Sequence, residues 1–219
     1  MRHVCFFAGY LRRFWLQLII SVPLERFIWA KDAVATVCGI KVINHSNRLK
    51  VDERFRTDTV AALHLIQSVD SRRFKRIQRE IKHIVNWHLL SRGTYTWPIR
   101  TCYVDYNRFR DHDNEEWRLW CYASLLVHEA THGAIYSRHI NYTPTLRSRI
   151  ERLCHTESSR FVTKSNTRER QWSEALVPPF DENDWHDSWH LSFSQKLIRT
   201  MAHLREARRS RKSDGDTLI

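Results

Sequence analysis

Hydrophobic residues recur at three- and four-residue spacing along much of the chain, and this is the period of an amphipathic α-helix. The clearest example is the segment 71–90, in which basic residues separate the apolar positions Phe74, Ile77, Ile81, Ile84 and Val85. This spacing predicts a single helix over 71–90 with a strongly basic outer face, which we interpret as a solvated face. Similar patterns predict further helices at 58–70, 115–137, 144–163 and 191–209.

Two short runs of β-branched and aromatic residues, at 39–44 and 99–106, predict strands. Asp113 is followed by Glu116 at the capping-box spacing, which indicates the start of the long helix, and Pro144 opens the next helix. Long helices with few strands predict an α+β fold that is predominantly helical. We expect a small sheet packed on the helix at 115–137.

The composition excludes several classes of protein. Of the 219 residues, 42% are hydrophobic and 27% charged, so a sizeable core is expected. Five glycines and five prolines are too few for a turn-rich β-sandwich or a collagen-like chain. Five cysteines without a C-x-x-C pair indicate reduced thiols rather than a disulfide framework. The net charge of +12 suggests an acidic partner surface, but no nucleic-acid module is visible, so nucleic acid is not the expected partner.

The N-terminal segment combines basic and apolar residues. Arg12 and Arg13 precede the apolar run 14–22, which is well short of the ~20 residues that span a bilayer. A buried or surface-docked helix is the main interpretation, and the alternatives are an anchor on an anionic membrane surface or an uncleaved signal. We therefore expect a cytoplasmic protein that this segment could attach peripherally to a membrane. The expected organisation is an N-terminal segment, a central domain and a C-terminal extension with a basic helix, at 1–30, 31–165 and 166–219.

Candidate chemistry is concentrated in the long helix, where residues 128–132 read HEATH, an H-E-x-x-H motif. Residues four apart lie on one face of a helix, so His128 and His132 can both bind one zinc ion. Glu129 lies beside them, where its carboxylate can act as general base towards a zinc-activated water. The metzincin extension of the motif is absent, because Ile135 and Arg138 stand where its glycine and third histidine belong.

A third protein ligand is expected from the next helix, as in the gluzincin class of zinc peptidases. Glu151 follows His132 by 19 residues, and this spacing favours it as the ligand. Glu157 lies within the apolar stripe of the same helix, so the periodicity favours Glu157, either as the ligand or as a carboxylate that orients a histidine. The two cannot easily reach one metal together, because six residues correspond to about 240° around the helix. We take Glu151 as the ligand and keep Glu157 as the alternative.

The two blocks LLVHEATHG and RIERLC resemble a family of small zincin-like proteins, which are predicted zinc metallopeptidases of gluzincin type. The resemblance covers about residues 70–162. It implies a minimal zincin fold that comprises an active-site helix, a glutamate helix and a small sheet. It also implies that an edge strand binds extended substrate, and the strand at 99–106 is our candidate for that role. Residues considered for stabilising an oxyanion are Tyr103, Tyr136, His139 and Tyr142, and the spacing does not select among them.

The function predicted from the sequence is a zinc-dependent metallopeptidase that hydrolyses peptide bonds in a peptide or protein substrate. His128, His132 and Glu151 would bind zinc, and Glu129 would be the catalytic base. One alternative is a zinc-containing binding or regulatory protein without catalysis, with a basic surface for nucleic acid or an anionic membrane. Another is a structural protein at a membrane face in which the motif is a coincidence.

Overall fold

The computed structural model describes residues 34–44, 49–87, 89, 91–97, 99–110, 114–140, 142–143 and 145–164. The N-terminal segment 1–30, the extension 166–219 and the helix expected at 191–209 lie outside these residues. Within the described part of the chain, none of the helices is both long enough and apolar enough to cross a membrane.

The sheet has five strands in the order β1-β2-β3-β5-β4. The strands are β1 (Val34–Val37), β2 (Ile40–Asn44), β3 (His83–Asn86), β4 (Gly93–Thr96) and β5 (Thr101–Val104). β2, β3 and β5 are parallel to one another, whereas β1 and β4 pair antiparallel at the two edges. A two-residue turn joins β1 to β2, and Cys38 and Gly39 both have positive φ there (51° and 79°), as a tight hairpin turn requires.

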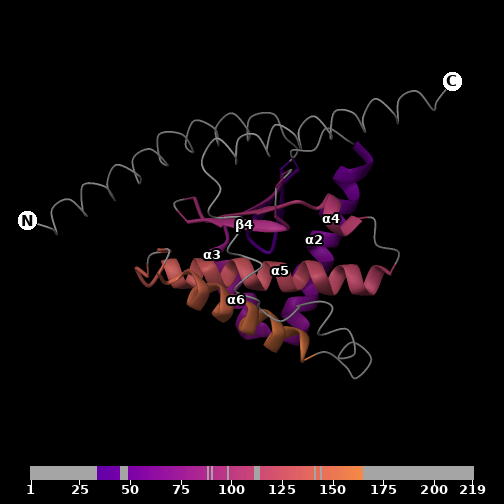
Figure 1. Ribbon diagram of the computed structural model, residues 1–219. Coiled ribbons are helices and arrows are strands. Elements are labelled where there is room, and N and C mark those ends of the chain that lie inside the picture. The colour runs from indigo at the N-terminus through magenta and orange to yellow at the C-terminus, as the bar shows by residue number, and fades with distance from the viewer. Residues whose placement is uncertain are drawn as a thin grey trace, which may run out of the picture. The chain divides into compact units, whose positions relative to one another are not determined.

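The helices are α2 (Leu49–Val69), α3 (Ser71–Glu80), α4 (Asn107–Arg110), α5 (Glu115–Tyr136) and α6 (Arg147–Val162). In Figure 1, α5 crosses the molecule beneath the sheet, and α6 lies along the opposite side of α5. The main core fills the space between sheet and helices, with Ile84 and Cys102 from the strands packed with Leu126 and Ala130 from α5. Because α5 is covered on both sides, its polar motif residues lie inside the protein.

These elements confirm the predicted fold class, since a mostly helical α+β domain packs a small mixed sheet against helices. The strand at 39–44 and the helix at 115–137 are confirmed with small changes at their ends. α5 is capped by the side chain of Asn114, which accepts a hydrogen bond from the backbone N–H of Trp117 at 2.9 Å. α6 begins three residues after Pro144, at Arg147.

The prediction of one helix over 71–90 is wrong beyond Glu80. Ile81 is extended (φ −107°, ψ 120°), and residues 83–86 form β3 between β2 and β5. Ile84 joins the core on the α5 side of the sheet, whereas Val85 packs on the other side with Ile43. Their side chains lie on opposite faces, as strand geometry demands, so the apolar spacing that suggested a helix arises from two elements in succession.

The expectation that residues 99–106 form the edge strand is also wrong. Those residues supply β5, which pairs with β3 on one side and β4 on the other. The edge strand beside α5 is β4, which pairs only with β5 among the described strands.

Candidate metal and catalytic site

The two motif histidines meet on the face of α5 that is turned towards α6. His128 Nε2 and His132 Nε2 lie 3.2 Å apart, and the ring planes are inclined at 61°. His132 is buried and His128 nearly so, because α6 covers this face of the helix. Burial lowers the pKa of His128 to about 4, which keeps its imidazole neutral. Burial alone would also lower the pKa of His132, but Cys154, Glu151 and Glu129 outweigh it and raise that pKa, so His132 would release a proton on binding a metal.

Glu151 reaches the same point from the second turn of α6. Its Oε2 lies 3.4 Å from His128 Nε2 and 3.6 Å from His132 Nε2. Burial alone would raise the pKa of Glu151, but its interactions with the two histidines hold the pKa below the usual range. Glu151 Oε2 is buried and accepts no hydrogen bond from any residue in the described part of the chain.

The three donor atoms fit a tetrahedral zinc site. Ligands about 2.0–2.1 Å from a tetrahedral zinc ion are about 3.3–3.4 Å from one another. The separations of 3.2, 3.4 and 3.6 Å between these donors match that spacing. A zinc ion bound by His128, His132 and Glu151 would also satisfy the buried carboxylate oxygen.

A second donor combination shares the two histidines. The sulfur of Cys154 and the donor nitrogens of His128 and His132 all lie within 4.8 Å of one another, so these three residues could also hold a metal ion. Cys154 is buried, carries a free thiol and follows Glu151 by three residues, which brings both to one face of α6. The sequence reasoning missed Cys154, although its i, i+3 spacing from Glu151 could have revealed it.

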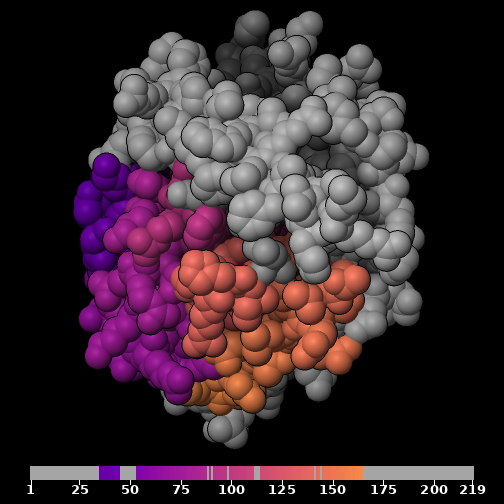
Figure 2. Space-filling model, turned by 90° about the vertical axis from the view of Figure 1, so that its left-hand side faces the viewer, coloured from indigo at the N-terminus to yellow at the C-terminus, as the bar shows by residue number. Residues whose placement is uncertain are grey.

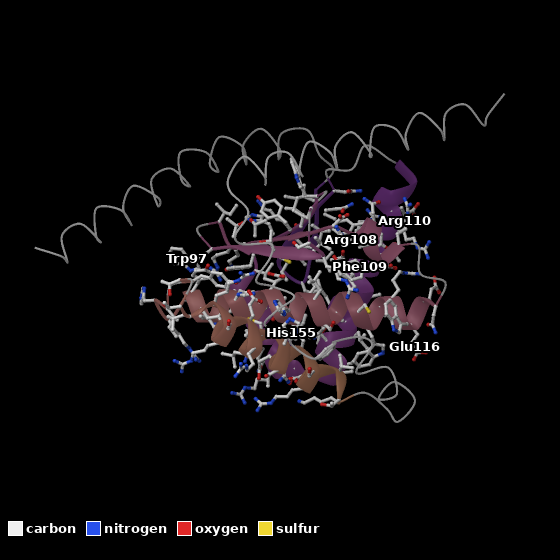
Figure 3. The ribbon with its side chains drawn as sticks, viewed as in Figure 1. Trp97, Arg108, Phe109, Arg110, Glu116 and His155 are labelled. Atoms are coloured by element: carbon white, nitrogen blue, oxygen red, sulfur yellow. The ribbon has the colours of Figure 1, made fainter. Side chains whose placement is uncertain are left out.

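His155 extends this face of α6 by one residue. Figure 3 shows it between α5 and α6, and its ring lies 5.1 Å from the ring of His128, nearly perpendicular to it. The contact is edge to face, a geometry that packs the two rings together. His155 therefore helps to fix the orientation of His128.

Glu129 lies on the side of α5 that faces the sheet edge. A Cβ added to Gly93 of β4 would lie 3.2 Å from Glu129 Oε1, so the carboxylate sits directly against the edge strand. Glu129 is buried, and its Oε2 has no hydrogen-bond partner among the described residues. Burial raises the pKa of Glu129 to about 7.

Glu157 occupies a different environment from the one proposed for it. Its carboxylate binds Arg76 at 2.8 Å, Arg160 at 3.2 Å and Arg73 at 3.3 Å. Arg73 and Arg76 belong to α3. In Figure 2 the surface of α3 adjoins the surface that α6 forms together with the end of α5. These arginines account for the burial of Glu157 without a metal.

The candidates for an oxyanion donor are dispersed. Tyr136 stacks on Tyr95, and Tyr103 lies on the face of the sheet away from α5. Tyr142 is the one that lies at the site, where its hydroxyl donates a hydrogen bond to Glu151 Oε1 and its ring packs against His132 at 5.8 Å.

Comparison of the chain with protein-family models, with curated proteins and with solved structures gave no match in any of the three.

Proposed function

We propose that this protein is a zinc-dependent metallopeptidase. The observation that carries the proposal is the triangle formed by His128 Nε2, His132 Nε2 and Glu151 Oε2, with edges of 3.2–3.6 Å. Three nitrogen and oxygen ligands that leave one coordination position open are typical of catalytic zinc sites. Glu129, next to His128 in the sequence, adds a buried carboxylate of raised pKa.

Zinc at this site would supply Lewis acidity, which activates water and polarises a carbonyl group. Glu129 would take the proton from the water and deliver it to the leaving amine. A buried carboxylate can perform both proton transfers in turn. With zinc bound, His128 and His132 would both be neutral ligands, because an imidazole must lose its proton to bind a metal.

The edge strand β4 is the part of the sheet that we propose for substrate binding. In the zincin-like proteins that the sequence resembles, extended substrate pairs antiparallel with an edge strand. β4 fits this role because Gly93 lies directly against Glu129, so a peptide along β4 would pass close to the catalytic carboxylate. Backbone pairing of this kind is largely independent of substrate sequence, and we propose a peptide or protein segment in extended conformation.

The proposal is tested by metal analysis and peptidase assay of the wild type, His128→Ala and Glu129→Gln. We expect one zinc per wild-type chain, none in His128→Ala, and full zinc content in Glu129→Gln. Against a mixture of unstructured peptides, Glu129→Gln should lose activity by about 10²- to 10⁴-fold, the usual contribution of a general base. Undiminished cleavage by Glu129→Gln, or a folded wild type that takes up no zinc, would overturn the proposal.

The second candidate is a zinc-containing binding protein without catalysis, and Cys154 is the observation that favours it. If its thiolate joined the two histidines and Glu151, all four positions of a tetrahedral site would be filled, as in structural zinc sites. Cobalt substitution separates the two candidates. A thiolate–cobalt charge-transfer band that disappears in Cys154→Ser, together with weaker cobalt binding in Glu151→Gln, would support the closed four-ligand site. The absence of the band would support the open, catalytic site.

A further inference from the structure

The two oxygens of Glu151 have different surroundings. Oε2 faces the two histidines, whereas Oε1 accepts a hydrogen bond from the hydroxyl of Tyr142. We propose that Tyr142, held in turn by Arg147, is a positioning residue that fixes the Glu151 carboxylate in the orientation that binds the metal. This inference rests on the proposed zinc site and adds two residues to it.

A constraint of this kind is needed because the last torsion of a glutamate side chain has broad energy minima. Left alone, the carboxylate could turn either oxygen, or both, towards the histidines. The bond from Tyr142 occupies Oε1 and leaves Oε2 as the atom 3.4 Å from His128 Nε2. Glu151 is thereby prepared to donate one oxygen before a metal arrives.

The direction of the hydrogen bonds follows from Arg147. A guanidinium group can only donate, and Arg147 Nε donates to the Tyr142 oxygen at 3.2 Å. Since that bond uses a lone pair of the oxygen, the hydroxyl hydrogen is available for Glu151. The chain Arg147 → Tyr142 → Glu151 therefore runs in one direction and ends on a carboxylate, where hydrogen bonds are strong.

The surrounding structure holds these three hydrogen-bonded residues in place. Arg147 is the first residue of α6 and is buried, and Glu151 lies one turn further along the same helix. Tyr142 lies between α5 and α6, with its ring against His132. The three residues thus connect the helix that carries the histidines to the helix that carries the third ligand.

The test is the zinc affinity of the full-length protein, measured by competition with a chromogenic chelator. Tyr142→Phe removes only the hydroxyl group, and we expect zinc affinity to fall by about 10- to 100-fold, as is usual when a partner of a metal ligand is lost. Tyr103→Phe is the matched control, because it removes a hydroxyl on the far face of the sheet and should leave zinc affinity unchanged. Arg147→Lys keeps the positive charge but loses Nε, and a smaller fall is expected.

A double-mutant cycle distinguishes positioning from a general effect on the fold. If Tyr142 acts through Glu151, Tyr142→Phe should have little further effect on zinc affinity in a Glu151→Gln background. Full affinity in Tyr142→Phe, or an equal loss in both backgrounds, would overturn the inference while leaving the zinc site intact. Wild-type affinity in Glu151→Gln, or no zinc binding by the wild type, would overturn the proposed site as well.

Discussion

Gly133 follows His132 directly, and replacing it with alanine tests how tightly the site helix is packed. A Cβ at this position would lie 2.8 Å from the Cβ of Glu80 and 3.0 Å from both Cζ and Oη of Tyr95. Carbon atoms in contact are normally about 3.5–4.0 Å apart, so the distance from the new Cβ to each of these three atoms would have to increase by several tenths of an ångström. Glu80 Cβ is attached to the backbone of α3, and the Tyr95 hydroxyl is bonded to the Glu80 carbonyl oxygen at 2.9 Å. Neither neighbour can move by a simple side-chain rotation.

Two effects oppose each other in Gly133→Ala. Overpacking a core typically costs about 1–3 kcal/mol, and the fixed neighbours here favour the upper end of that range. Alanine gains about 1 kcal/mol over glycine in a helix interior. We therefore expect the free energy of unfolding to fall by about 2 kcal/mol, or the melting temperature by about 4–8 °C at 2–4 °C per kcal/mol.

The assay is urea and thermal unfolding followed by circular dichroism, with Gly93→Ala as the comparison. The atoms nearest to a Cβ at Gly93 are the ends of the Leu125 and Glu129 side chains, at 2.9–3.2 Å, and these can move aside. The loss of stability in Gly93→Ala should therefore stay below about 1 kcal/mol. If Gly133→Ala were more stable than the wild type, as helix propensity alone predicts, or if Gly93→Ala lost more stability, the packing argument would be refuted.

Two further predictions concern charged groups outside the metal site. Burial alone would raise the pKa of Asp70, but hydrogen bonds from Lys164 and from the backbone and side chain of Arg73 lower it to about 2. Because the pKa is lowered in the folded state, ionised Asp70 stabilises the fold at pH values above its unfolded pKa of 3.8. The difference in free energy of unfolding between wild type and Asp70→Asn should be about 2 kcal/mol at pH 7 and should shrink as the pH falls from 4 towards 2. A pH-independent difference in urea unfolding would contradict this. Glu157→Gln removes the carboxylate that Arg76 shares with Arg73, although Arg73 keeps its ion pair with Asp70, and should cost about 2 kcal/mol of stability while zinc affinity stays within twofold. A loss of zinc binding like that of Glu151→Gln would restore Glu157 as a ligand candidate.

The parts of the fold that local sequence determines were predictable. The H-E-x-x-H motif lies within one uninterrupted helix, so the proximity of His128 and His132 follows from helix geometry alone. The end of α3 was not predictable in this way. Ile84 and Val85 form a strand because β2 and β5 pair with them on either side, and those partners are distant in the sequence.

The sequence could not decide between Glu151 and Glu157 as the ligand for the same reason, because the deciding contacts come from residues distant in the sequence. Periodicity correctly indicated that Glu157 is largely buried and that its carboxylate needs a partner. The partners are arginines, two of which lie more than 80 residues away on α3, and the sequence does not reveal that α3 packs there. The role proposed for Tyr142 also depends on tertiary structure, because the loop between α5 and α6 brings its hydroxyl to Glu151. The identity of the zinc ligands itself stays a prediction.

Whether the site is catalytic depends on α6, since Glu151 and Cys154 face the histidines from the same helix. The two side chains differ in their protonation state when no metal is bound. The carboxylate of Glu151 is already ionised because its pKa is held low, and its oxygen lies at ligand spacing from both histidines. Burial raises the pKa of Cys154, so in the absence of a metal its thiol holds its proton and would have to release it on binding one. In the proposed site, Glu151 would complete three protein ligands and leave the fourth position for water, and Glu129 would act as the base. The proposal of an open, hydrolytic site therefore rests on Glu151 rather than Cys154 as the third ligand.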